Sequence, residues 1–397
     1  MFAARIDRPG TEHDRRLVYA IAAGRGGIFI LPVLIPYFDE RIGLSFREFL
    51  YSESVYAAVL IVMEVPSGWF ADVTRRKTAL ATGALVALLG FALLWQADGL
   101  VAAMTAQAVI GLGLSLVSGA DTALLYDLLA AEGRSDDFRR AEGLRHAIWL
   151  YATAASGIAG GLAYGLSAEL PFLLTMAASG LTALAALLVR EPPRRRAPAA
   201  RGIDLPALRA LWRDANARAV LRLIAYVGLV FAGTNIVFWL QQRYWQQTGV
   251  PTVWFGLLAA AGLLLAGAVG QHGHRLEAAV GRRRALAGLP LALLAVYGLA
   301  GAFPGPAGVA LLLLSSAAWG FGWPAVQAAL NARIGGERRA TVLSIANLAL
   351  KLAFIPLSVG LGLLEEMAMA SGALTGLAAL LALAWLAPAS PLRRPDA

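Results

Sequence analysis

The sequence predicts an all-α membrane protein of twelve transmembrane helices, arranged as two pseudo-symmetric bundles of six. Apolar residues make up 58% of the chain and charged residues only 15%, whereas a soluble domain contains about 45–50% apolar and about 25% charged residues. The apolar runs are about twenty residues long, the length of a membrane-spanning helix and about twice that of a spanning β-strand. Because backbone polar groups must be satisfied within the bilayer, runs of this length predict helices.

Twelve apolar segments follow one another along the chain, each long enough to span a bilayer. The first is longer than the core of a signal peptide, and no convincing cleavage site follows it, so we expect it to be retained as a span. The expected spans are residues 17–38, 46–70, 78–96, 100–126, 142–166, 171–189, 219–240, 252–271, 285–303, 307–330, 341–364 and 370–388.

Lys and Arg residues are distributed unevenly between the two sides that these spans define. With a cytoplasmic N-terminus, 27 of the 34 Lys and Arg residues lie in cytoplasmic segments and only Arg41, Arg47 and Arg243 lie in external ones. Short cytoplasmic loops are enriched in basic residues. We therefore predict a multi-pass protein of the cytoplasmic (inner) membrane with both termini in the cytoplasm. The net charge of +9 is then a consequence of topology and does not indicate nucleic-acid binding.

A basic stretch with several prolines begins at Arg190 and divides the chain. We expect an N-terminal six-helix bundle over residues 1–190, a cytoplasmic linker over 191–218 and a C-terminal six-helix bundle over 219–397. Two short motifs recur in the two halves at nearly the same offset, which favours a duplicated unit. They are Arg139-Arg140-Ala141 with Arg338-Arg339-Ala340, and Gly68-x3-Asp72 with Gly273-x3-Glu277.

Charged residues occur in only some of the spans. The third, sixth, ninth and twelfth spans contain none, so we expect these four to face lipid. Ionisable side chains at membrane depth normally face a bundle interior or an aqueous cavity. The spans that contain them are therefore expected to surround a shared interior.

The loop between the second and third spans reads Glu64-Val-Pro-Ser-Gly-Trp-Phe-Ala-Asp72-Val-Thr-Arg-Arg76-Lys. This sequence resembles the signature loop of the major facilitator superfamily, and the layout of six plus six helices resembles that family as well. The fourth span resembles a bacterial branch of that superfamily that contains many uncharacterised transporters. Its sequence includes Ser118-Gly-Ala-Asp121-Thr-Ala-Leu-Leu-Tyr-Asp127.

The chain also departs from the family pattern. Arg75 stands where the loop usually has glycine, and Val73 stands where it usually has a basic residue. Gln107 occupies the position of an arginine found in many proton-coupled exporters of the family, and Ser156-Gly-Ile-Ala-Gly-Gly161 replaces their Gly-Pro-x-x-Gly-Gly. These changes leave the expected fold in place and weaken the case for drug–proton antiport.

The resemblance implies a secondary transporter whose two halves rock around a site near the membrane midplane. It also implies that Asp72 latches the outward-open state by capping the eleventh span, where a carboxylate favours the positive end of the helix dipole. Asp72 and Arg76 are four residues apart and can face one another, and Asp127 is a second acceptor for Arg76. The alternative is that both carboxylates are solvated loop charges. The residues we assign to gating are Gly68, Asp72, Arg76, Asp121 and Asp127.

Arg25, Glu64 and Asp121 are expected at about the same membrane depth, because each lies six to eight residues from the cytoplasmic end of its span. An unpaired arginine at that depth is very unfavourable, so we expect Arg25 to be paired. Two interpretations remain open. The pair is a permanent structural contact, or it exchanges partners or protons during a transport cycle.

Lys351 is expected near the midplane in the eleventh span, where the second half offers no acid. Its partner is then a first-half acid such as Glu53, or an anionic group of a substrate, unless it is deprotonated or extends to the surface. Aromatic and amide side chains in the seventh, tenth and eleventh spans suit an amphipathic organic molecule, although tryptophans also form interfacial belts. The predicted substrate-binding residues are Arg25, Glu53, Asn235, Trp323, Gln327, Asn347 and Lys351.

The sequence favours transport over the other classes of function considered. It contains no cysteine and only four histidines, and we find no nucleophile–base pair, metal-ligand set or nucleotide-binding motif. We therefore predict no enzyme activity and no cofactor. We expect a monomeric transporter that moves a small organic solute, amphipathic or anionic, by proton-coupled export. Import, movement of lipid, and a sensor that retains the fold without transport are the alternatives.

Overall fold

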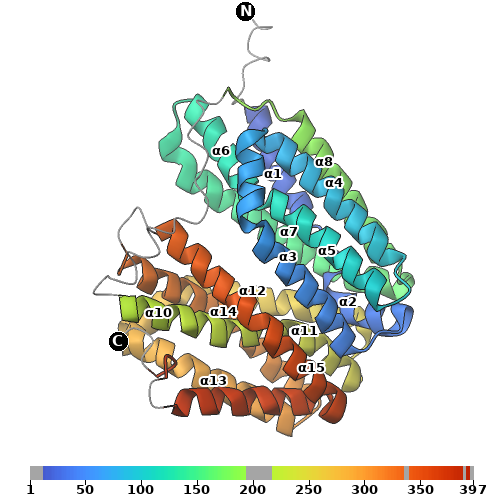
Figure 1. Ribbon diagram of the computed structural model, residues 1–397, viewed down its shortest axis with the longest axis vertical. Helices are drawn as coiled ribbons and strands as arrows, with labels where there is room; N and C mark the ends of the chain where they lie inside the picture. Colours follow the sequence, from blue (N-terminus) through green and yellow to red (C-terminus); the bar gives the residue numbers. More distant parts are fainter. Residues whose placement is uncertain (1–11, 194–216, 335–338, 388–389, 394–397) are drawn as a thin grey trace, which may run out of the picture. The chain divides into compact units, whose positions relative to one another are not determined.

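The computed structural model describes residues 12–193, 217–334, 339–387 and 390–393, and every regular element in these ranges is helical (Figure 1). Ten stretches of this described chain are long and apolar enough to cross a membrane. The helix α7 (Phe138–Leu166), which begins with several charged residues, is not among the ten. The stretch Val342–Leu386 counts once, although α15 (Arg339–Leu386) is broken into two helices at Ala368 and Met369. Twelve spans thus stay a prediction.

The described residues form two compact units. The first contains the described residues of Met1–Leu34 and Val59–Gly202, and the second contains those of Ile35–Ala58 and Ile203–Ala397. The segment Ile35–Ala58, which we call the arm, therefore belongs to the second unit, whereas the sequence places it in the first bundle. Most of the predicted linker lies outside the described residues, and the predicted boundaries at residues 190 and 219 stay predictions.

The first unit is built from α1, α4 to α8 and the greater part of α3. Its inner core is formed where α1, α4, α6 and α8 meet, with Leu80, Leu124 and Leu128 fully buried. The elements of this unit are α1 (Glu12–Gly26), η2 (Leu31–Val33), α3 (Phe46–Val73, continuing from the arm), α4 (Arg76–Trp95), α5 (Leu100–Val117), α6 (Ala120–Ala131), η4 (Ser135–Asp137), α7 and α8 (Leu170–Leu188).

The first predicted span is not one continuous helix. α1 ends at Gly26, and the next regular element, η2, begins only at Leu31. The Gly26 backbone oxygen accepts a hydrogen bond from Ser156 Oγ of α7 at 2.7 Å, so the break is satisfied within the protein, as a bilayer requires. Gly160 lies so close to this break that a Cβ on it would be 1.8 Å from the Phe29 backbone oxygen.

The second unit contains the arm and the helices that follow the central gap. α12 packs on α14, and α13 and α11 each pack on α15. Gly320 of α14 permits the first of these contacts, because a Cβ there would be 2.0 Å from the Ala266 backbone oxygen. The elements of this unit are α2 (Leu34–Tyr37), η3 (Phe38–Ile42), α10 (Ala217–Tyr226), η5 (Val227–Phe231), α11 (Ala232–Gln247), η6 (Thr252–Trp254), α12 (Phe255–Val280), α13 (Arg282–Ala302), α14 (Pro306–Asn331) and α15.

The helices without charge in their spans expose rows of leucines. In α4 the exposed leucines are spaced by four residues, which places them on one helix face. A stripe of this kind is what a lipid-facing helix requires. The exposed leucines include Leu85, Leu89 and Leu93 in α4, Leu181, Leu184 and Leu188 in α8, Leu291 and Leu299 in α13, and Leu380, Leu383 and Leu386 in α15.

Candidate functional site

A network of two arginines and two carboxylates lies in the first unit, where α1, α6 and α7 meet. Asp121 forms ion pairs with both Arg25 and Arg145, and its distance to Arg145 Nη1 is 2.5 Å. Arg145 also donates two hydrogen bonds to Glu142, at 2.6 and 2.7 Å. The pairing expected for Arg25 is therefore present, with Asp121 as its partner.

The ends of the helices favour the charges of this network. Arg25 lies in the last turn of α1 and Asp121 lies in the first turn of α6, where the helix dipoles stabilise a cation and an anion respectively. Gly119, with a φ of 76°, allows the chain to bend between α5 and α6 so that Asp121 begins a new helix. Asp121 is 1% exposed and Arg145 is 8% exposed. Because charges this deeply buried must be compensated, the two partners of Asp121 stabilise the fold of this unit.

The signature loop contains a different ion pair from the one that its spacing suggests. α3 ends at Val73 and α4 begins at Arg76, so Asp72 and Arg76 do not share a helix. Arg76 Nε lies 2.8 Å from Asp127 Oδ2, in an ion pair without hydrogen-bond geometry, and Asp72 is exposed. Asp127 is thus an ion-pair partner of Arg76 within the first unit, and the latch role of Asp72 and Gly68 stays a prediction.

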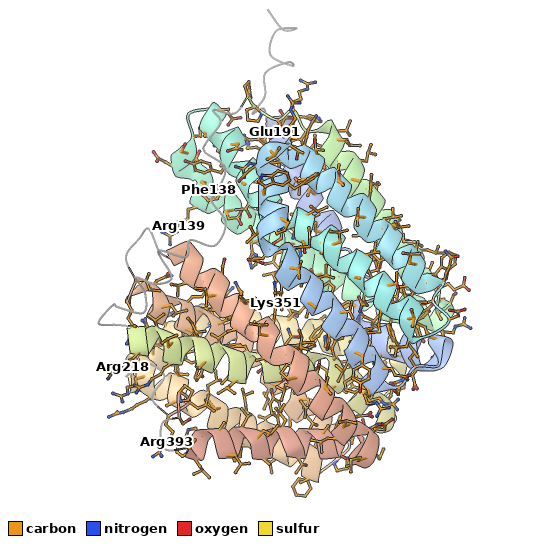
Figure 2. The ribbon with its side chains drawn as sticks, in the orientation of Figure 1. Phe138, Arg139, Glu191, Arg218, Lys351 and Arg393 are labelled. Carbon is orange, nitrogen blue, oxygen red and sulfur yellow. The ribbon has the colours of Figure 1, made fainter. Side chains whose placement is uncertain are left out.

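Glu191 caps the N-terminus of α4, next to this loop (Figure 2). Its two carboxylate oxygens accept hydrogen bonds from the backbone N–H groups of Arg76 and Lys77, at 3.1 and 3.2 Å. A carboxylate satisfies free N–H groups and favours the helix dipole at this position. The cap connects the end of α8 to the signature loop.

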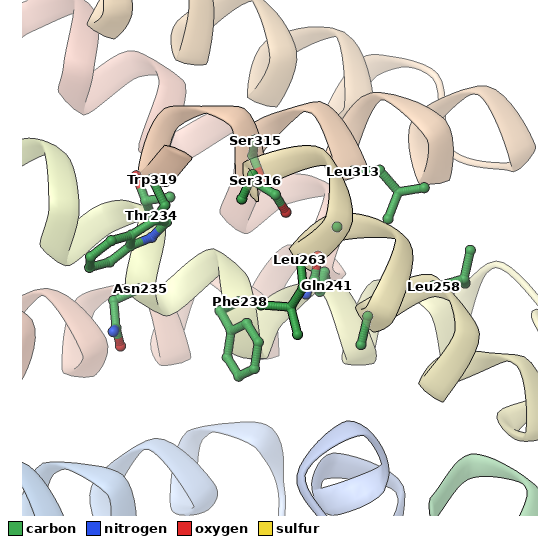
Figure 3. A pocket seen from close by; sticks show the side chains of 13 residues that line it. Thr234, Asn235, Phe238, Gln241, Leu258, Leu263, Leu313, Ser315, Ser316 and Trp319 are labelled. Carbon is green, nitrogen blue, oxygen red and sulfur yellow. The ribbon is translucent and has the colours of Figure 1, made fainter. Parts of the chain in front are cut away.

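A cavity of about 370 Å³ lies in the second unit, between α11, α12 and α14 (Figure 3). We call it the pocket. Its walls combine aromatic rings, aliphatic side chains, hydroxyls and amides, and none of its lining residues is charged. The lining residues are Thr234, Asn235, Phe238, Gln241, Leu258, Ala259, Gly262, Leu263, Ala266, Leu313, Ser315, Ser316 and Trp319. Ligand pockets are apolar for the most part, with a few polar groups that fix orientation, and this composition fits that description.

One predicted binding residue, Asn235, lines the pocket, and a second lies beside it. Trp323 packs on Trp319, with ring centroids 5.8 Å apart, and on Phe231 at 5.5 Å. Gln327 is half-buried one turn further along α14, and Asn347 is exposed on α15. The structure therefore brings Asn235 and Trp323 together through Trp319 and does not place Gln327 or Asn347 in the lining.

The charged residues that the sequence assigned to substrate binding lie away from the pocket lining. Arg25 belongs to the ionic network, and Glu53 is 6% exposed in the arm. Lys351 is half-buried on α15, well inside the first of its two helices (Figure 2). Their binding roles stay predictions. Trp239, an aromatic residue of the seventh predicted span, is 8% exposed and packs on Phe49 at 5.2 Å.

Several residues of these sites were not singled out from the sequence. Glu142 was not singled out, although its i,i+3 spacing to Arg145 on one helix indicates that the two side chains can pair. Gln241, Ser315 and Ser316 were not either, because uncharged polar residues in a membrane helix often satisfy their own backbone. Ser315 does so, since its Oγ donates to the Leu312 carbonyl at 2.7 Å. Over the part of the chain that the structure describes, no group of three His, Asp or Glu residues is arranged to hold a metal.

Known structures with a similar fold are transporters. A mutant of the nucleoside transporter NupG is similar with a TM-score of 0.80 at 13% identity, over 94% of this chain and 99% of that chain. A bacterial homologue of the human lysosomal transporter Spinster, inward-facing and unoccupied, has a TM-score of 0.76 at 14% identity, over 96% of each chain. A D-xylose–proton symporter has a TM-score of 0.72 at 14% identity, over 93% of this chain and 96% of that chain. Identities this low show the fold alone.

The family match comes from the sequence itself. Residues 17–358 match the model of the Major Facilitator Superfamily, which is well over half of the chain. No curated protein sequence matches. Together with the helical fold and the similar transporter structures, the match indicates a transporter and not an enzyme. The chain belongs to the major facilitator superfamily.

Proposed function

We propose that the protein is a secondary transporter that moves a small organic solute across the cytoplasmic membrane by alternating access. We further propose that it exports the solute and that the export is coupled to protons. The pocket is the observation on which the proposal depends. Its volume of about 370 Å³ is within the range of about 300–1,000 Å³ typical of small-molecule sites. The unequal distribution of basic residues supports cytoplasmic termini, and we expect the protein to act as a monomer.

The lining of the pocket supports an amphipathic solute. Trp319 and Phe238 offer aromatic faces, while Asn235, Gln241 and Ser316 offer donors and acceptors. An anionic group of the solute would find no cation among the lining residues. If the solute is anionic, its charge must therefore lie outside the pocket, where Lys351 and Arg25 are the predicted partners.

The sequence contains no nucleotide-binding motif, which leaves an ion or solute gradient as the energy source. The gradient that we propose is one of protons. Glu53 is the acid we assign to this coupling, since it is buried in a predicted span. Asp121 already compensates two arginines. Export follows from the family resemblance alone.

Proteoliposomes test the proposal directly. Ligands that raise the melting temperature of the detergent-purified protein would first be identified, and each would be tested by counterflow with and without a pH gradient. We expect counterflow of at least one stabilising ligand, and net movement against its gradient when protons flow the other way. Counterflow that is insensitive to the pH gradient would contradict proton coupling. Stabilising ligands that never cross the membrane would contradict transport and favour a sensor.

A further inference from the structure

Several residues of the arm make polar contacts with α11 and α15, two helices that lie far later in the sequence. At the beginning of the arm, the Ile35 backbone N–H donates to Gln242 Oε1 of α11 at 3.2 Å. Further along, Asp39 and Arg47 form ion pairs with residues of the same two helices. These contacts are consistent with the grouping of the arm with the second unit.

Arg243 of α11 binds two carboxylates from different parts of the chain. Its Nη1 lies 2.8 Å from Asp39 Oδ2 of the arm, and its Nε lies 3.0 Å from Glu365 Oε1 of α15. The two carboxylates differ in exposure, because the Asp39 side chain is 41% exposed and the Glu365 side chain 5%. Water can replace an exposed partner at little loss, whereas a buried carboxylate left alone is strongly destabilising. The contact with Asp39 is therefore the one that opens readily.

Gln247 fixes the buried carboxylate in place. Its Nε2 donates to Glu365 Oε1 at 2.8 Å, and its Oε1 accepts from the Ala370 backbone N–H, also at 2.8 Å. Ala370 directly follows the break in α15, where Met369 has a φ of 60°. Arg243, Glu365 and Gln247 thus form a block that joins α11 to both parts of α15 without using the arm.

Besides the contacts of Ile35 and Asp39, three contacts join the arm to the same two helices. Arg47 Nη1 lies 2.7 Å from Glu366 Oε2, and the hydroxyls of Ser54 and Ser358 lie 2.9 Å apart. The Phe49 ring packs edge-on against Trp239. Each of these contacts joins one residue of the arm to one residue of α11 or α15.

We propose that Arg243 is a positioning residue of the transport cycle. Glu365 holds Arg243 in position, and Arg243 binds the arm through its ion pair with Asp39. This ion pair keeps the external end of the pathway closed. The inference rests on the proposed alternating access, in which the arm must leave α11 and α15 when the external end opens. The ion pair with Asp39 breaks at that step, and the pair with Glu365 persists.

Thiol labelling tests this role without any substrate. The chain contains no cysteine, so Asn235→Cys introduces a single reactive thiol in the pocket wall. The measurement is the rate at which a membrane-impermeant methanethiosulfonate, added outside intact cells, modifies this thiol. We expect Asp39→Asn and Arg243→Gln each to raise the rate several-fold, because the closed external end loses its fastening. Asp39→Glu keeps the charge and is expected to retain the slow rate.

Arg41→Gln is the matched control. Arg41 is an exposed charge two residues from Asp39, and no ion pair of it is recorded in the described structure. The thiol in the Arg41→Gln variant should be labelled at the same rate as in the parent protein that carries only Asn235→Cys. Equal labelling of Asp39→Asn and the parent, in protein that elutes as a single folded species, would overturn the inference, and so would equal acceleration by Arg41→Gln. If Arg243→Gln fails to fold, Asp39→Asn alone decides. Because labelling needs no solute, a failure of transport assays would count against the proposed function and leave this result standing.

Discussion

Two polar sites, one in each unit, differ in kind. The network of Arg25, Asp121, Arg145 and Glu142 in the first unit is made of charged side chains paired with one another, and Asp121 and Arg145 in it are buried. In the pocket of the second unit the polar side chains are uncharged amides and hydroxyls beside aromatic rings. Buried charges are retained only when each has a partner. Neutral donors and acceptors can exchange protein partners for water at a small net change in free energy.

This difference suggests a division of labour between the units. A solute that must bind and leave in every cycle needs contacts that form and break easily, and the lining of the pocket provides contacts of that kind. A charge network that persists through the same cycle needs contacts whose loss is strongly destabilising. We therefore expect substitutions in the network to change stability first and substitutions in the pocket to change solute affinity first.

Arg145→Ala is the strongest test of this division. It removes a buried partner of Asp121 and the two hydrogen bonds that Arg145 donates to Glu142, and we expect a loss of roughly 3–5 kcal/mol in the free energy of unfolding. Thermal unfolding in detergent, followed by tryptophan fluorescence, measures the effect as a lower melting temperature. Arg134→Ala is the control, because the Arg134 side chain is 48% exposed and its ion pairs lie at the surface. A melting temperature that is equal in the two variants would show that the network is not structural.

Gly160→Ala should have the next largest effect. The added Cβ would overlap the Phe29 backbone oxygen at the break that follows α1, and overpacking of this kind typically costs about 1–3 kcal/mol or more when backbone must move. Gly143→Ala, in the same helix, has open space around the new methyl group and should stabilise by about 0.5–1 kcal/mol. The same unfolding assay measures both. Stabilisation by Gly160→Ala would contradict the tight contact between α7 and the break.

The sequence was sufficient for the fold and for part of the site, and the reasons are physical. Long apolar runs and basic loops predict spans and sidedness because the bilayer has a fixed thickness and a preferred side for charge. That Arg25 is paired was also predictable, because few acids are available at that depth, although the sequence did not choose between Glu64 and Asp121. The break after Gly26 was not, since it depends on the close approach of Gly160 and on the hydroxyl of Ser156.

The contacts between the arm and α11 were the least predictable. Asp39 and Arg243 are 204 positions apart, and in the sequence both are ordinary charges near the ends of spans. The pocket was predicted only through Asn235 and the neighbouring tryptophans. Its serines and Gln241 share their composition with many packing positions in membrane helices, so only their arrangement around a cavity distinguishes them.

Asn235→Ala sharpens the comparison from the side of the pocket. Loss of one hydrogen bond to a bound solute is worth about 0.5–1.5 kcal/mol, so the concentration for half-maximal counterflow should rise severalfold while the melting temperature stays unchanged. Asn347→Ala is the matched control, because Asn347 is exposed on α15 and does not line the pocket. A larger loss of affinity in Asn347→Ala than in Asn235→Ala would move the binding site from the pocket to the face of α15.

Gly68→Ala should not lower stability and is the most selective test of the predicted latch. Gly68 is exposed in the first unit, and an added Cβ would meet nothing within 4 Å. The free energy of unfolding should therefore rise by about 0.5–1 kcal/mol, as for Gly143→Ala, because Gly68 lies inside α3 and glycine in a helix loses more backbone entropy on folding than alanine. If the signature loop must approach another helix during the cycle, the same methyl group should nevertheless slow transport, because the approach leaves no room for it. Counterflow and thermal unfolding of the one variant separate the two effects. Unchanged rates would remove Gly68 from the gating residues, and a parallel loss of stability would show that its role is in folding.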